Sequence, residues 1–129
     1  MEKTKECSQI IEIANKKKVR IVLAEAGQKF NIEKEISFTI LWPNKNKLIT
    51  ENPLNNNSIV LKLTYGNFQM LFTGDIEQIA EKRIVEEYGE NLKSTIIKIA
   101  HHGSKTSSTG EFINAVKPQI ALIGVREKE

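Results

Sequence analysis

The sequence predicts a layered α/β fold in which helices pack on a β-sheet. A strand–turn–strand pattern lies in the middle of the chain, and strand, helix and strand patterns alternate through the C-terminal half. The length of 129 residues corresponds to one domain or less.

The composition excludes several classes of protein. Hydrophobic residues make up 40% and charged residues 27%, which is ordinary for a soluble globular protein and excludes a purely disordered chain. No apolar run approaches the roughly 20 residues that a membrane helix needs, and the first six residues lack the apolar core of a signal peptide. The single cysteine, Cys7, excludes an internal disulfide. A net charge of +3 is too small to indicate nucleic-acid binding by itself.

The first part of the chain is predicted to contain one helix and two strands. Residues 6–18 have helical spacing, and residues 19–24 form an apolar run rich in branched side chains, typical of a buried strand. Residues 36–41 alternate as in a half-buried strand that ends at Trp42–Pro43. The side of the helix expected to be buried consists of Ile10, Ile11, Ile13 and Ala14.

Residues 44–57 are predicted to form a long loop, because they include six asparagines and Pro53. Asparagine tolerates left-handed backbone and bonds to its own chain, so turn formation explains this composition. A role at the edge of a functional site is the alternative, with Asn57 as a candidate substrate contact.

The remainder is predicted as a hairpin followed by alternating helices and strands. Strands at 58–65 and 68–73 flank a two-residue turn, and the second is apolar at nearly every position, so both its faces are expected to be covered. A helix over 76–88 follows, with an apolar stripe at helical spacing. The later elements are a strand at 95–100, a helix at 108–116 and a strand at 119–125.

Asp75 follows the second hairpin strand and precedes a helix. With Gln78 three residues later, it matches a helix-capping box. It is also a candidate metal ligand, since ligands bind at strand ends in α/β sheets. The two roles are compatible.

His101 and His102 end the strand predicted at 95–100. Successive side chains of a strand point to opposite faces, so a continuous strand would offer only one of them to a common metal. Gly103 could turn the chain at this point.

The polar segment that follows could bind an anion. Ser104 and Lys105 are the candidate contacts, and Lys105 is the stronger one for phosphate because it is charged. Ser108 and Glu111 match a capping box instead.

Three blocks together resemble the C-terminal hydrolase domain of the ComEC-type DNA-internalisation competence proteins, a domain of the metallo-β-lactamase superfamily. The blocks are NNNSIVLKLTYG (55–66), LFTGD (71–75) and KIAHHGSKTSS (98–108). The resemblance extends from about Lys17 to Val125.

This resemblance implies an αββα sandwich, of which the chain would be the C-terminal half, with metals at one edge. It implies Zn or Mn, two ions in the complete domain, and a metal-activated water that attacks a DNA phosphodiester during competence-related DNA uptake. Asp75 matches the family's acidic ligand, and His101 and His102 match its later histidine motif. Ser104, Lys105 and Asn57 would then contact the substrate.

The superfamily's principal ligand cluster, His-x-His-x-Asp-His, is absent from these 129 residues. We therefore expect a partial domain, residues 1–129, that is inactive alone, needs the remainder of the parent domain, and self-associates through an exposed sheet face. The alternative is a non-catalytic remnant that binds nucleic acid or oligomerises. The family's parent protein lies in the cell membrane, and this segment is expected to be a soluble domain of it.

Overall fold

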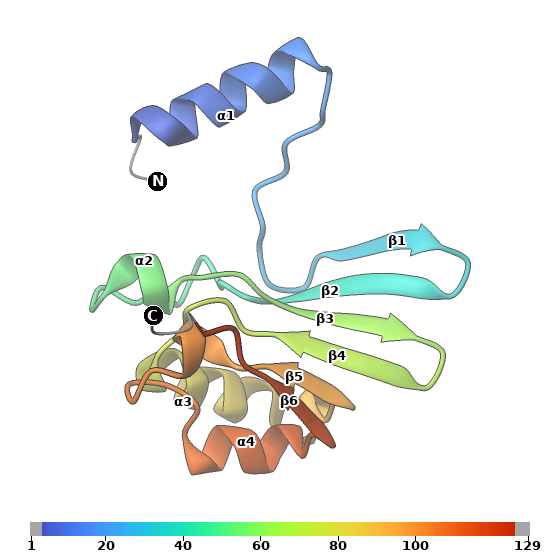
Figure 1. Ribbon diagram of the computed structural model, residues 1–129, viewed down its shortest axis with the longest axis vertical. Helices are drawn as coiled ribbons and strands as arrows, with labels where there is room; N and C mark the ends of the chain where they lie inside the picture. The colour runs from blue at the N-terminus through green and yellow to red at the C-terminus, as the bar shows by residue number, and fades with distance from the viewer. Residues whose placement is uncertain (1–3, 126–129) are drawn as a thin grey trace.

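The computed structural model describes residues 4–125 and has one six-stranded sheet (Figure 1). The sheet order is β1-β2-β3-β4-β5-β6, antiparallel from β1 to β4 and parallel from β4 to β6. The α/β class is therefore confirmed. The elements are α1 (Lys5–Lys16), β1 (Lys29–Glu33), β2 (Ile36–Trp42), α2 (Pro53–Asn56), β3 (Val60–Tyr65), β4 (Phe68–Phe72), α3 (Gln78–Tyr88), η1 (Gly89–Leu92), β5 (Ile96–Lys98), η2 (Ala100–Gly103), α4 (Gly110–Val116) and β6 (Ile120–Leu122).

The hydrophobic core lies between the sheet and the helices α3 and α4, which pack on one of its faces (Figure 1). Leu71 and Ile97 are register partners on β4 and β5, and both are buried. Residues directly opposite on neighbouring strands share a face, so these two side chains define the face covered by the helices. The core residues contributed by the helices and the turns beside them include Ile76, Ala80, Ile84, Leu92, Phe112 and Val116.

The other face of the sheet carries a continuous apolar row across all six strands. Each member is the register partner of the next, and among the described residues none of the six is buried. Met70 and Phe72 on β4 are thus only half-buried, so the prediction that both faces of this strand are covered is wrong. The row consists of Phe30, Phe38, Leu63, Met70, Ile96 and Ile120.

The N-terminal helix forms as predicted, but its predicted burial is wrong. Thr4 caps α1 by accepting a hydrogen bond from the Cys7 amide at 3.2 Å. The helix stands apart from the sheet (Figure 1) and buries none of its residues. Ile10 is 67% exposed and Ile13 is 54% exposed. Periodicity identified the helix, but within the described residues no surface packs on its apolar side.

The strand predicted at 19–24 is not formed. Val19, Ile21 and Leu23 are exposed in an extended linker between α1 and β1, with no strand pairing among the described residues. The sheet instead begins with β1, a strand that the sequence pattern did not predict. All five residues of β1 are exposed, and its register with β2 shifts between Asn31 and Glu33, so an apolar pattern had little to mark it.

The asparagine-rich loop contains the short helix α2 and is anchored to the core. Trp42 is fully buried, and its indole N–H donates to the backbone oxygen of Asn56 at 2.7 Å. Because Trp42 is the only tryptophan, its fluorescence reports on the folding of both the sheet and this loop.

Over residues 4–125, no helix is both long enough and apolar enough to cross a membrane.

Candidate metal site

Three neighbouring parallel strands place a carboxylate, an imidazole and a carbonyl at one edge of the sheet. Asp75 follows the end of β4, His102 follows β5, and Gly124 follows β6. The carboxyl ends of parallel strands meet at the same edge, which is where α/β sheets commonly bind ligands. The buried hydroxyl of Thr73 donates to the backbone oxygen of Lys98 and ties the ends of β4 and β5 together.

Both ring nitrogens of His102 have an oxygen atom nearby. Nδ1 lies 2.9 Å from the backbone oxygen of Gly124, and Nε2 lies 4.0 Å from Oδ1 of Asp75. A carbonyl can only accept a hydrogen bond, so Nδ1 carries the proton. In the neutral ring, Nε2 then has a lone pair near a carboxylate, an arrangement that a cation stabilises. A backbone carbonyl behind Nδ1 is also the usual support of a metal-ligating histidine.

Both histidines lie in a left-handed turn rather than in the strand. The backbone φ angles are 47° for His101 and 53° for His102, and β5 ends earlier, at Lys98. The alternation rule for strands therefore does not apply to the pair. The amide of His101 donates to the Gly74 oxygen at 3.1 Å, which fixes the turn beside Asp75. Non-glycine residues in this backbone region cluster at functional sites.

His101 faces Glu77, a residue that no sequence motif marked as part of the site. The Nδ1 atom of His101 is buried, has no hydrogen-bond partner among the described residues, and lies 3.7 Å from Oε1 of Glu77. Asn52 donates to both carboxylate oxygens at 3.1 Å, and Thr106 donates to Oε1 at 3.3 Å. The hydrogen bond from Asn52 is the main reason that the pKa of Glu77 lies below its ordinary value.

A second missed carboxylate, Glu81, is fully buried. It accepts hydrogen bonds from the backbone amides of Ser108 and, at 2.8 Å, Thr109. The histidines lie on the loop that ends at these two residues. Glu81 therefore holds the end of this loop against α3. Glu81 lies four residues after Glu77 and three before Ile84, which places it on the same side of the helix as the buried Ile84. A charged residue in such a position needs a partner, and this spacing was the signal in the sequence that could have identified Glu81.

The two predicted capping boxes are wrong by one or two positions. The N-cap of α3 is Glu77 rather than Asp75, and within residues 4–125 no side chain caps this helix. This leaves the Asp75 carboxylate at the sheet edge. The N-cap of α4 is Thr109 rather than Ser108, and its hydroxyl accepts from the Phe112 amide at 3.3 Å.

The three predicted substrate contacts lie in different environments. Asn57 accepts from the Ile49 amide and donates to two backbone oxygens within its own loop, at 2.8 and 2.9 Å. Ser104 bonds to Thr106 through its hydroxyl at 3.0 Å. Lys105 is exposed on the histidine loop. Their contact with a substrate remains a prediction.

Asp75 and His102 are suitable metal ligands, but the two side chains are too few for a complete metal site. Asp75 and His102 have the donor types that zinc and manganese accept. Over residues 4–125 there is no group of three or more His, Cys, Asp or Glu side chains able to hold an ion. Since a catalytic zinc takes three protein ligands plus water, Asp75 and His102 alone would not complete such a site.

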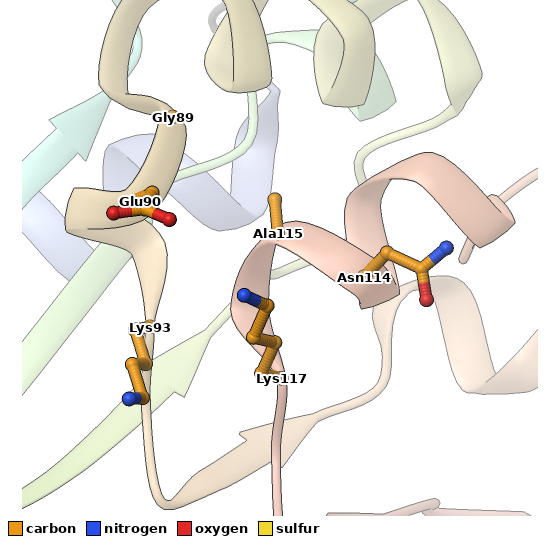
Figure 2. A pocket seen from close by; sticks show the side chains of 6 residues that line it. All are labelled: Gly89, Glu90, Lys93, Asn114, Ala115 and Lys117. Carbon is orange, nitrogen blue, oxygen red and sulfur yellow. The ribbon is translucent and has the colours of Figure 1, made fainter.

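A cavity of about 410 Å³ lies at the opposite end of the parallel strands. Figure 2 shows its lining on two segments, Glu90 and Lys93 from one side and Asn114 and Lys117 from the other. The helices α3 and α4 both end here. The negative ends of their dipoles explain lysines at this position. The lining of the cavity does not include Asp75, His101 or His102.

Comparison with known proteins finds relatives that are similar to most of this chain. No protein-family model matches it. It is 40% identical over 87 residues to Competence protein ComA of Neisseria gonorrhoeae, covering 67% of this chain and 12% of that protein. It is 30% identical over 115 residues to ComE operon protein 3 of Bacillus subtilis (strain 168), covering 89% and 14%.

The names of these homologues support a competence-related family. A further homologue, Recombination protein 2 of Haemophilus influenzae, is 31% identical over 88 residues, covering 68% of this chain and 10% of that protein. The chain thus spans 10% to 14% of the length of these three relatives. The similarity concerns one segment of each.

Proposed function

We propose that this chain supplies one edge of a metal-dependent hydrolase site that acts on DNA phosphodiesters during competence-related DNA uptake. Asp75 and His102 are the metal ligands in this proposal, and the other ligands come from the remainder of the parent domain, so the chain alone is inactive. The observation that carries the proposal is His102, whose Nδ1 faces a carbonyl at 2.9 Å while its Nε2 faces the Asp75 carboxylate at 4.0 Å.

A zinc or manganese ion bound there would activate a water molecule and polarise a phosphoryl oxygen. In this proposal, the residues of this chain hold the metal ion and orient its ligands. Gly124 fixes the ring of His102, and the His101 amide holds Gly74 beside Asp75. Lys105 is exposed on the same loop and is the proposed contact for a DNA phosphate, with Ser104 and Asn57 as further proposed contacts.

Manganese binding tests the proposal on the chain itself. We expect Mn²⁺, added to ¹⁵N-labelled protein, to broaden the amide signals of Asp75, His102 and Gly124 first, because the ion sits between the strand ends. Asp75→Asn and His102→Gln are each expected to weaken this effect at least about tenfold. Asp75 is the only aspartate in the chain, so the substitution removes a unique group.

Glu86→Gln is the control, since Glu86 is an exposed carboxylate on α3. Broadening spread over exposed carboxylates, or selective broadening that survives both site variants, would rule out the proposed ligand pair. Zn²⁺ should compete with Mn²⁺ for the same signals.

The second candidate is an oligomerising module, and the apolar row across the sheet favours it. A face of this kind on an isolated chain is expected to be covered by another protein surface. We expect sedimentation velocity to show a dimer whose dissociation constant rises at least tenfold in Leu63→Gln, in the middle of the row. Leu54→Gln is the control, because Leu54 is 72% exposed on α2, away from the row. A monomer at every concentration tested would eliminate self-association through this face.

A further inference from the structure

We propose that Glu77 is a positioning residue that fixes the tautomer of His101, with the proton on Nδ1 and the lone pair on Nε2. The two histidines then have different supports, since a backbone carbonyl holds His102 and a side-chain carboxylate holds His101. The meaning of this arrangement for hydrolysis rests on the proposed function, but the tautomer itself does not.

The geometry around Nδ1 of His101 favours a proton there. The atom is buried and, among the described residues, lacks a hydrogen-bond partner, and the Oε1 atom of Glu77 lies 3.7 Å away. A lone pair on Nδ1 would face the negative carboxylate, whereas an N–H at the same position is attracted to it. A buried polar atom without a partner is unfavourable, so a small movement that closes this contact lowers the free energy.

The carboxylate is held in place from three sides. Asn52 donates to both of its oxygens, Asn56 donates to Oε2 at 3.3 Å, and Thr106 donates to Oε1. The backbone amide of Glu77 also donates to Oδ1 of Asn56 at 3.0 Å. The asparagine-rich loop therefore orients Glu77, and Glu77 in turn orients His101. This gives the loop a role at the site that turn formation alone does not require.

The tautomer determines what the exposed part of the ring can bind. The His101 side chain is 33% exposed, and because Nδ1 is buried, this exposure belongs to the rest of the ring. A neutral Nε2 with a lone pair binds an electron-pair acceptor, either a metal ion or the proton of a water molecule. It cannot donate to a phosphate oxygen. Phosphate contact is then left to donors such as Lys105.

The experiment is a long-range ¹H–¹⁵N correlation spectrum of the imidazoles in the metal-free full chain at about pH 8, where an ordinary histidine is neutral. The chain has two histidines, so His102→Gln leaves the signal of His101 alone. We expect Nδ1 of His101 to be protonated. In Glu77→Gln we expect the ring to shift toward the tautomer with the proton on Nε2.

Glu86→Gln, on the exposed side of the same helix, is the matched control and should leave the tautomer unchanged. Native Trp42 fluorescence verifies the fold of each variant. A wild-type ring protonated on Nε2, or a folded Glu77→Gln protein with the wild-type tautomer, would overturn the proposal. The wild-type spectrum decides even if Glu77→Gln does not fold. No metal is added, so this outcome is independent of the manganese titration.

Discussion

Replacing Glu81 with alanine is expected to lower the free energy of unfolding by about 3 kcal/mol or more. The buried carboxylate accepts hydrogen bonds from the amides of Ser108 and Thr109. Hydrogen bonds to a charged group contribute about 1.5–3 kcal/mol each. Without the carboxylate, two backbone amides lose their acceptor just before α4, whose Phe112 belongs to the core. For a domain whose whole stability is of order 5–15 kcal/mol, this is a large fraction.

Urea denaturation followed by Trp42 fluorescence measures this effect. Glu86→Ala removes an exposed carboxylate from the same helix and should change the unfolding free energy by no more than about 0.5 kcal/mol. Equal stabilities for the two variants would mean that Glu81 does not hold the loop as the structure shows.

Gly74→Ala is expected to destabilise the fold by about 2–4 kcal/mol and to disrupt the proposed metal site at Asp75 and His102. Gly74 has a φ of 55°, and an added Cβ would lie 2.8 Å from the Cβ of Ser58 and 3.1 Å from the Ile59 oxygen. The backbone must therefore move. Because Asp75 is the next residue and Gly74 accepts the amide of His101, we expect this movement to change the position of Asp75 relative to the histidines.

Gly66→Ala separates backbone strain from steric conflict. Gly66 has nearly the same φ, 54°, but no atom of the residues that the structure describes lies within 4 Å of an added Cβ. The free energy of unfolding of Gly66→Ala should fall by only about 1–2 kcal/mol, the cost of the backbone strain. This variant should keep the selective manganese broadening. Gly74→Ala should lose this broadening in the fraction that remains folded. If both variants bind manganese like the parent chain, the position of Gly74 does not control the site.

Local patterns predicted the elements whose environment lies within a short stretch of sequence. The two-residue turn at Gly66–Asn67, the stripe of α3 and its end at Tyr88 are all found in the structure. Burial was predicted less well, because it depends on what packs on a face. Ile13 has the spacing of a core residue, yet α1 packs on nothing within the described residues.

The candidate site was only partly predictable for a similar reason. Asp75 and His102 follow strands that can be recognised in the sequence, so their meeting at one edge follows from parallel pairing. Glu77 and Glu81 act through contacts with residues 21 to 29 positions away, and a single sequence does not reveal such pairs. The left-handed turn of the histidines also depends on its anchoring to Gly74.

The most direct test of the proposed metal edge is a crystal structure of the chain grown with Mn²⁺ or Zn²⁺, with anomalous diffraction recorded at the metal's absorption edge. The proposal predicts an anomalous peak between Oδ1 of Asp75 and Nε2 of His102, about 2.0–2.2 Å from each. A well-ordered site edge without a peak at saturating metal, or a peak held only by other residues, would contradict it.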